Sequence, residues 1–327
     1  MKTKVCIIGC GAISGVHIEA VKNCKNAELY GICDIDESKK EKAEKLNVRF
    51  FADFDDVLCD KEVNAVHICT PHYLHFEMIK KALEHGKKVV CEKPCVITKA
   101  EFDELKTLGG IEKVSFVMQN RLNKSIEELK KLIENDALGN VVGISGILTW
   151  HRTKEYYGQA DWRGKWATEG GGVLINQAIH TLDLMTYFAG EVESVEANMA
   201  NFSLSDAIEV EDTCTAYLKF KSGISGVFFA TNANAENDDF EITVYFEKGT
   251  AKCAMGKLFV SGKEICANEK AVIGKNYWGK MHEKLIADFY DKNSFFDINS
   301  VENTMNTLFA MYESSKLKRT VYLKSGM

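Results

Sequence analysis

The first third of the chain alternates short apolar runs with segments of helical periodicity. The apolar runs are typical of strands over 4–9, 27–33, 63–70, 89–91 and 114–118. Strands that alternate with helices form a parallel sheet, because each right-handed crossover between parallel strands carries a covering helix. The pattern therefore predicts an α/β fold with a parallel sheet in a first domain over residues 1–120.

The pattern of hydrophobic and polar residues changes after about residue 120. From 192 to about 267, strand-like runs follow one another, and apolar and polar residues alternate along them. Such alternation is typical of an antiparallel sheet with two different faces. We therefore expect a second, α+β domain over 121–327, built on an open, mainly antiparallel sheet. The other predicted elements are a helix over 125–136, a strand over 141–150, a loop over 151–169, a helix after Gly170-Gly171-Gly172, helices near 281–292 and 300–315, and a strand over 320–323.

Composition narrows the classes of function. The 41 Lys and Arg residues against 47 Asp and Glu residues give a formal charge of -6, which repels nucleic acids and anionic lipid surfaces. No apolar stretch approaches the roughly 20 residues of a membrane-spanning helix, so we expect a soluble protein with neither nucleic-acid nor membrane partners. The eleven cysteines lie mostly in apolar runs and form no C-x-x-C pair. This usage favours free thiols in a reducing cytoplasm over disulfides or structural zinc.

A glycine turn and an acid mark a candidate nucleotide site. Gly9-Cys10-Gly11-Ala12-Ile13-Ser14 follows the first predicted strand and opens a helix. Gly9 permits a tight turn, Gly11 lets a pyrophosphate approach, and the helix N-terminus supplies partial positive charge. Ser14 stands where a third glycine is usual, so an incidental turn is the alternative. Asp34 ends the second strand, where a carboxylate binds ribose hydroxyls and favours NAD over NADP, unless it is merely solvated.

Two further predicted strands are followed by residues that could bind a ligand or act in catalysis. Thr70-Pro71-His72-Tyr73-Leu74-His75 follows the third predicted strand, and Glu92-Lys93-Pro94 follows the fourth. Ligands of open α/β sheets bind at the carboxyl ends of the strands. Lys93 is therefore a candidate acid/base group, with an ordinary surface lysine as the alternative.

The predicted helix after the glycine run carries polar residues on one stripe. Asn176, His180 and Asp183 recur at i, i+4 and i+7 among apolar neighbours. A buried polar group without a partner costs about 1–3 kcal/mol, so these residues face either a ligand or structural partners. Asp183 has the further alternative of orienting His180. We expect no metal, because Asn is a poor transition-metal ligand and hydride transfer needs none.

Together these motifs resemble the glucose-fructose oxidoreductase / inositol dehydrogenase (Gfo/Idh/MocA) family, along essentially the whole chain. The resemblance also rests on Gln119-Asn120-Arg121 and Trp162-Arg163. It implies a Rossmann domain at the N-terminus. It further implies a homodimer or homotetramer, because the family uses its open sheet for oligomer contacts.

The resemblance also implies roles for individual residues. Lys93 matches the usual proton carrier, and His180 matches a residue beside the reacting hydroxyl. Many members have Asp at the position of Asn176, and Asn cannot take a proton, so Lys93 and His180 must suffice here. The expected substrate contacts are Arg121, Asn176, Asp183 and Tyr156. The expected cofactor contacts are Gly9, Gly11, Ala12, Ile13, Asp34, Thr70, Pro71, His72 (a frequent Asn in the family), His75, Glu92, Lys93, Gln119, Trp162 and Arg163.

The sequence thus predicts an NAD-dependent dehydrogenase for a secondary alcohol of a sugar, glycoside or cyclitol. Two alternatives stay open. One is an NAD-dependent glycosidase or lyase that oxidises the sugar transiently, which would keep its NAD rather than consume it. The other is a non-enzymatic, cofactor-sensing regulator, which would have no need to keep both Lys93 and His180.

Overall fold

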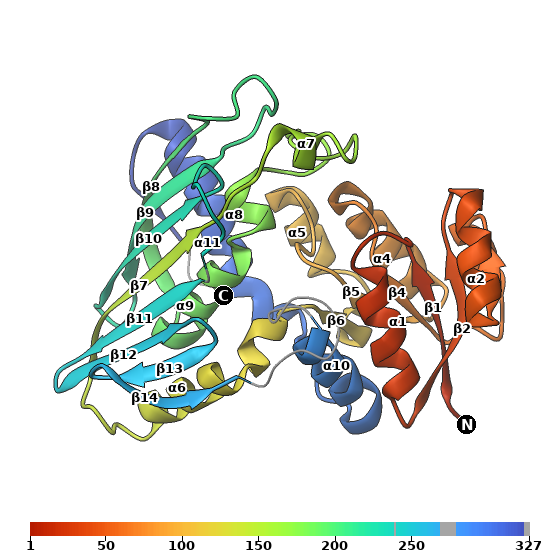
Figure 1. Ribbon diagram of the computed structural model, residues 1–327, viewed down its shortest axis with the longest axis horizontal. Helices are drawn as coiled ribbons and strands as arrows, with labels where there is room; N and C mark the ends of the chain where they lie inside the picture. Colours follow the sequence, from red (N-terminus) through yellow and green to blue (C-terminus); the bar gives the residue numbers. More distant parts are fainter. Residues whose placement is uncertain (239, 269–278, 324–327) are drawn as a thin grey trace. The chain divides into compact units, whose positions relative to one another are not determined.

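The computed structural model describes residues 1–238, 240–268 and 279–323 (Figure 1). The chain forms two compact units, described separately below. The first unit comprises Met1–Gln119 with Lys270–Ser300, and the second comprises Asn120–Glu269 with Val301–Met327.

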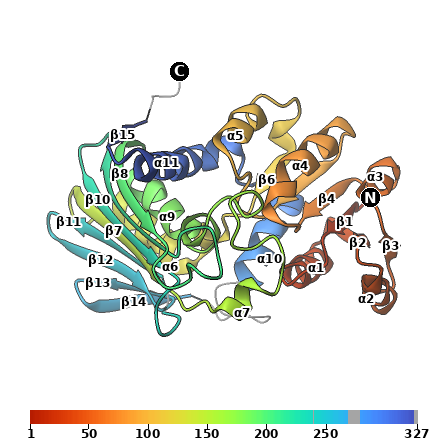
Figure 2. The same ribbon diagram turned by 90° about the horizontal axis from the view of Figure 1, so that it is seen from above.

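This division differs from the predicted boundary, which placed all of 121–327 in one domain. The late helix α10 (Gly279–Ala287) lies beside α1 (Ser14–Asn23) in both ribbon views (Figures 1 and 2). The Asn23 side chain donates a hydrogen bond to Glu283 at 3.0 Å. A contact between segments so far apart in the chain leaves no local sequence pattern, which is why the prediction missed it.

The first unit is built on a six-stranded sheet with the order β3-β2-β1-β4-β5-β6. Every neighbouring pair is parallel, so the predicted parallel sheet is confirmed. The strand order reverses between β1 and β4, and this switch point is where open α/β sheets bind ligands. The strands are β1 (Thr3–Ile8), β2 (Ala27–Cys33), β3 (Arg49–Phe51), β4 (Ala65–Ile68), β5 (Lys88–Cys91) and β6 (Val114–Phe116).

Helices cover both faces of this sheet, which explains its apolar strands. Val5, Cys6 and Ile7 in β1 are fully buried, as expected for a strand covered on both faces. The edge strand β3 was not predicted, because its three residues are too few to show a period. The helices are α1, α2 (Lys40–Leu46), α3 (Phe54–Cys59), α4 (His75–Glu84), α5 (Lys99–Leu105) and α10, with 3-10 turns over Glu37–Lys39, His72–Leu74 and Ile111–Lys113 and a π-helical turn over Asp288–Lys292.

The second unit is built on a nine-stranded sheet with the order β14-β13-β12-β11-β7-β10-β9-β8-β15. Only β7 and β10 pair in parallel, so the predicted mainly antiparallel sheet is confirmed. The strands are β7 (Val141–Thr149), β8 (Val192–Ala200), β9 (Thr213–Phe220), β10 (Ser225–Thr231), β11 (Glu241–Phe246), β12 (Gly249–Ala254), β13 (Lys257–Val260), β14 (Lys263–Ala267) and β15 (Val321–Tyr322).

Helices α9 and α11 lie on one side of this sheet (Figure 2). Gly146 in β7 allows the close approach of α9, because a Cβ there would lie 2.5 Å from the Met185 sulfur. The opposite face exposes apolar side chains such as Val227 and Tyr217. The helices are α6 (Lys124–Glu134), α7 (Lys154–Tyr157), α8 (Val173–Asn176), α9 (Ile179–Ala189) and α11 (Ile298–Leu317), with a 3-10 turn over Gln119–Leu122.

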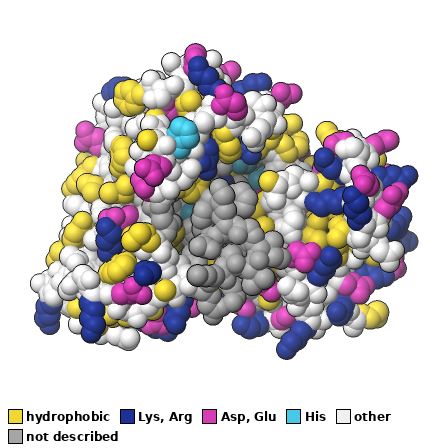
Figure 3. Space-filling model, in the orientation of Figure 1, with side chains coloured by type: hydrophobic (Ala, Val, Ile, Leu, Met, Phe, Trp, Pro, Cys, Tyr) yellow, Lys and Arg dark blue, Asp and Glu magenta, His cyan; other side chains and the backbone are white. Residues whose placement is uncertain are grey.

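Two surface properties bear on partners. Among the helices of the described ranges, none has the length and apolar character needed to cross a bilayer. On the face drawn in Figure 3, basic and acidic side chains are interspersed. Outside the residues drawn in grey, that face shows no continuous basic surface of the kind that binds nucleic acid.

Candidate active site

The glycine turn after β1 has the geometry of a dinucleotide site. Gly9 has a φ of +88°, and a Cβ there would lie 2.8 Å from the Cys69 carbonyl oxygen, so only glycine fits. Gly11 and Ala12 are exposed just before the ten-residue helix α1 begins at Ser14. A pyrophosphate can therefore approach both the backbone and the positive end of the helix.

Asp34 lies beside this turn, at the end of β2. Its carboxylate accepts a hydrogen bond from the Cys10 amide at 2.7 Å and another from the Asp36 amide at 2.9 Å. The neighbouring Ile35 is 93% exposed. These contacts fix a negative charge next to the glycine turn, where it suits ribose hydroxyls and repels a 2′-phosphate.

His75 joins the turns that follow β4 and β5. Its two ring nitrogens lie 2.7 Å from the Pro94 carbonyl oxygen and 3.0 Å from the Thr70 carbonyl oxygen. Burial lowers the pKa of His75, and the two carbonyl acceptors oppose that shift. Both nitrogens contact the backbone, so His75 holds these two turns together; its contact with the cofactor stays a prediction.

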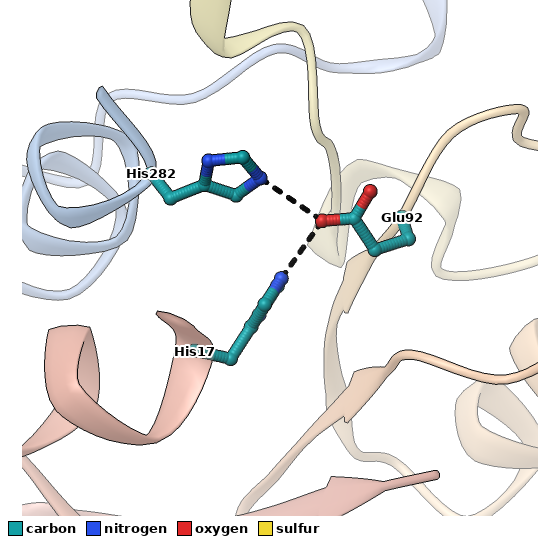
Figure 4. Close-up of side chains that lie close together, drawn as sticks. All are labelled: His17, Glu92 and His282. Carbon is teal, nitrogen blue, oxygen red and sulfur yellow. Dashed lines mark hydrogen bonds and ion pairs between the residues drawn. The ribbon is translucent and has the colours of Figure 1, made fainter. Parts of the chain in front are cut away.

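Glu92 and Lys93 follow β5. Glu92 is buried and Lys93 is half-buried, and the peptide bond between Lys93 and Pro94 is cis. One Glu92 oxygen accepts hydrogen bonds from His17 at 2.9 Å and from His282 at 3.1 Å (Figure 4). Sequence analysis missed both histidines, since their partner lies 75 and 190 residues away. The predicted cofactor residues His72 and Gln119 are also buried in this unit.

The predicted polar stripe in the second unit is divided between two helices. Asn176 ends α8, whereas His180 and Asp183 belong to α9. Between the helices, the Ala178 amide bonds to the Val173 carbonyl, five residues back, so the helical path widens here. The three residues therefore do not form the continuous stripe that their spacing predicted.

Arg121 and Asp183 form a buried ion pair. The guanidinium donates two hydrogen bonds to the carboxylate, at 2.6 Å and 2.8 Å, and Thr304 donates a third at 2.8 Å. Both side chains are less than a tenth exposed. This pairing ties α9, which carries Asp183, to the turn that carries Arg121; the contact of either residue with substrate stays a prediction.

Glu169 connects the other predicted contacts of this unit. It is fully buried, and its carboxylate accepts hydrogen bonds from the Asn176 side-chain amide and from the Gly164 backbone amide. Gly164 directly follows Trp162 and Arg163. Sequence analysis missed Glu169, although its position just before the glycine run was a signal.

Tyr156 lies between two arginines. The guanidinium of Arg163 stacks 4.3 Å from the centre of the Tyr156 ring, and that of Arg152 stacks 4.9 Å from it. Gln177, next to Asn176, donates to the Tyr156 hydroxyl at 3.4 Å. The structure thus brings Tyr156 and Arg163 together near the segment that carries Asn176.

The glycine run before α8 packs closely against Glu211. A Cβ on Gly172 would lie 1.9 Å from the Glu211 carbonyl oxygen, so this close approach needs glycine. The buried Glu211 carboxylate accepts hydrogen bonds from Gly172, Leu174 and Tyr312. Burial raises the pKa of Glu211 to about 7 despite these bonds.

The two predicted catalytic residues belong to different units. Lys93 lies in the first unit with the glycine turn and Asp34, and His180 lies in the second with Asn176 and Tyr156. Their convergence on one substrate stays a prediction.

Comparison with known proteins identifies the family of the chain. Residues 3–118 match a family model described as "Oxidoreductase family, NAD-binding Rossmann fold", and residues 126–252 match one described as "GFO/IDH/MocA C-terminal domain". Myo-inositol 2-dehydrogenase of Thermotoga maritima is 28% identical over 75% of this chain and 73% of its own length. Glucose-6-phosphate 3-dehydrogenase of Bacillus subtilis is 31% identical over 60% of this chain and 57% of its own.

A solved structure extends the likeness to the whole chain. The WlbA dehydrogenase of Bordetella pertussis, in complex with NADH and UDP-GlcNAcA, aligns with a TM-score of 0.86, 28% identity and full coverage of both chains. The glycine turn and Asp34 fit a bound NAD. The matched family model is described as NAD-binding and the WlbA complex contains NADH, so both comparisons agree with this cofactor. The protein is an NAD-binding oxidoreductase of the Gfo/Idh/MocA family.

Proposed function

We propose that the protein oxidises a secondary alcohol of a sugar, glycoside or cyclitol, or reduces the corresponding ketone. The observation that carries this proposal is the position of Lys93. It follows β5, next to β4, in the same unit and at the same strand ends as the glycine turn and Asp34. An amine there can reach a ligand bound at the switch point.

Lys93 is proposed to take the proton of the hydroxyl group. When bound, NAD accepts the hydride from the same carbon. An unperturbed lysine amine is protonated near pH 7, so this role requires a site that favours the neutral amine.

His180 and its neighbours are proposed to bind the sugar. His180 would hydrogen-bond the reacting hydroxyl, and Asn176 and Tyr156 would bind other hydroxyls. Arg121 and Asp183, already paired with each other, would hold α9 in place. The relatives support this substrate class, since two are dehydrogenases named for an inositol and for glucose 6-phosphate.

The direct test follows NADH absorbance across a panel of sugars, glycosides, sugar acids, nucleotide-linked sugars and inositols. Lys93→Met should retain NADH binding and lower kcat by about 10²–10⁴-fold. Lys61→Met, at an exposed position, is the matched control and should change neither. A Lys93→Met protein with near wild-type turnover would remove Lys93 from the mechanism.

The same assay separates the two alternative functions. Release of sugar without net NADH formation, with NAD retained, would indicate a glycosidase or lyase. A protein that binds NADH and sugars without any turnover would be a sensor.

We also propose a homodimer or homotetramer assembled through the open face of the nine-stranded sheet. Val227 on β10 is 57% exposed and pairs across the strands with Tyr217 on β9, which is 47% exposed. Tyr245 on β11 continues the apolar surface. Contiguous exposed apolar side chains on a sheet face are typical of an interface.

A further inference from the structure

The glycine turn of the first unit departs from the usual nucleotide motif at Ser14, where a third glycine is usual. Ser14 is fully buried at the start of α1. Its hydroxyl donates a hydrogen bond to the Gly11 carbonyl oxygen at 2.7 Å and accepts one from the Lys42 ammonium at 2.8 Å. The serine therefore closes the turn and also holds the side chain of a lysine, and a glycine could do neither.

Lys42 reaches the glycine turn from α2. It is the third residue of that helix and is half-buried. Burial raises the pKa of Cys10, inside the turn, and of Cys69, directly after β4, and the positive charge of Lys42 opposes both shifts. The charge of Lys42 therefore acts where β1 and β4 end, which is the switch point of the sheet.

The ammonium of Lys42 has donors to spare for a ligand. An ammonium has three N–H donors. Over the parts of the chain that the structure describes, the Ser14 hydroxyl is its one hydrogen-bond partner, and no carboxylate lies within ion-pair distance of it. The nearby Lys39 differs, because its amine pairs with Asp36 at 3.1 Å. Lys42 is thus held at the turn by a neutral group that leaves its charge uncompensated.

The turn needs a positive charge if it is to bind an anion. Asp34 is fixed beside it by the amides of Cys10 and Asp36, and this carboxylate repels a phosphate group. The N-terminus of α1 supplies only a partial positive charge. The whole positive charge of Lys42 offsets the repulsion from Asp34.

We propose that Lys42 binds the pyrophosphate of NAD, and that Ser14 is the positioning residue that holds its ammonium at the glycine turn. A lysine ammonium is a common phosphate ligand, which it binds as a point charge. Because Ser14 holds the long side chain before the cofactor arrives, less conformational entropy is lost on binding. The inference concerns the binding of the cofactor and does not depend on the proposed role of Lys93.

The position of Lys42 distinguishes the pyrophosphate from the other phosphate of a dinucleotide. The 2′-phosphate of NADP is attached to the adenosine ribose, which binds at the end of the second strand, where Asp34 lies. Lys42 instead contacts Ser14 at the start of α1, and its charge acts on Cys69 after β4. These observations favour the pyrophosphate as the group that Lys42 binds.

The test measures how cofactor fragments bind to the full-length protein. NADH is titrated by its fluorescence, and ADP-ribose and adenosine by displacement of NADH. In Lys42→Met the Kd values of NADH and ADP-ribose should each rise about tenfold, because a hydrogen bond between two charged groups is lost. The Kd of adenosine, which has no phosphate, should stay within about twofold. The rise of the ADP-ribose Kd between about 50 mM and about 500 mM KCl should be smaller in Lys42→Met, because salt screens the lost attraction.

Further variants separate charge from position. Lys42→Gln keeps a donor for Ser14 without the charge and should lose as much ADP-ribose affinity as Lys42→Met, which it replaces if that variant does not fold. Ser14→Ala should raise the ADP-ribose Kd about threefold, and adding it to Lys42→Met should change the Kd by less than about twofold, because Ser14 acts through Lys42. Lys45→Met is the matched control, since Lys45 lies on the same helix with a 73% exposed side chain paired with Glu41. It should leave all three Kd values within about twofold.

Three results would contradict the inference. An unchanged ADP-ribose Kd in Lys42→Met or Lys42→Gln would show that the charge does not bind the cofactor. Equal losses for adenosine and ADP-ribose would show that Lys42 only supports the fold of the turn. A loss for NADPH at least about tenfold larger than for NADH would assign Lys42 to the 2′-phosphate. A protein that shows the expected Kd values but oxidises no alcohol would contradict the proposed function and leave this inference in place.

Discussion

Exchanging the acid and the amide at positions 169 and 176 tests how the second unit holds its predicted ligand-binding residues. Glu169 is fully buried and accepts hydrogen bonds from the Asn176 side chain and the Gly164 backbone. Asn176→Asp would place a second carboxylate against the first, which is fully buried. Glu169→Gln would instead bring two amide side chains together and remove the negative charge.

The magnitudes follow from the burial of both groups. A hydrogen bond to a charged group contributes about 1.5–3 kcal/mol, and an uncompensated buried charge costs about 3–5 kcal/mol. We therefore expect Asn176→Asp to lower the free energy of unfolding by about 3–5 kcal/mol near pH 7. Two adjacent buried carboxylates share a proton more readily as the pH falls, so this loss should shrink at acidic pH.

The double variant Glu169→Gln/Asn176→Asp restores one acid and one amide with their positions exchanged. Unfolding of the four proteins is followed by circular dichroism in urea, and the free energies form a double-mutant cycle. We expect the double variant to be more stable than Asn176→Asp, with a coupling energy of about 2 kcal/mol or more. Turnover should follow the same order, since Asn176 is itself a predicted substrate contact and Gly164 follows the predicted cofactor contacts Trp162 and Arg163.

Additive effects in this cycle would refute the reasoning. They would mean that the two side chains do not share a hydrogen bond in solution. A destabilisation of Asn176→Asp that stays constant from pH 5 to pH 8 would also count against it, because a shared proton must make the loss depend on pH.

Three further predictions concern other parts of the chain. Asp34→Ala should reduce the preference for NADH over NADPH by about tenfold or more, measured as the ratio of Kd values by fluorescence; an unchanged ratio would remove Asp34 from cofactor selection. Glu211 has a folded-state pKa of about 7 against an ordinary 4.5, so its contribution to stability is complete below pH 4.5 and declines by about 3 kcal/mol as the pH rises through 7. Thermal unfolding of Glu211→Gln across this range should lack that decline, and an identical profile would contradict the assignment. Val227→Arg should convert the proposed oligomer to a monomer in light scattering, and a retained oligomer would place the interface elsewhere.

The parallel sheet and its ligand-binding edge could be predicted because their signals are local. The glycine turn needs Gly9 itself, and Asp34 must end the adjacent strand, so both leave fixed marks in the sequence. The same holds for Lys93, which follows a short buried strand. The edge strand β3 left no such mark, because a three-residue strand has no readable period.

The partners of these residues could not be predicted, because nothing local connects them. His282 reaches Glu92 across 190 residues, and Arg121 reaches Asp183 across 62. The break after Asn176 was hidden for a related reason. The spacing of Asn176 and His180 suits a continuous helix, and the bond from Asn176 to Glu169 becomes visible only in three dimensions.

The buried polar clusters themselves argue for function rather than stability. A buried ion pair or carboxylate recovers little of its desolvation cost, and well-packed apolar residues of similar volume often serve as well or better. Glu92 and Glu169 are both buried, and both bond the backbone or side chain of a residue that the sequence singles out, Lys93 and Asn176 respectively. An apolar side chain would fill either space but would hold neither neighbour in one orientation. We therefore expect substitutions at these glutamates to lower kcat more than stability alone explains, since their hydrogen bonds orient the two residues that we propose to contact the substrate.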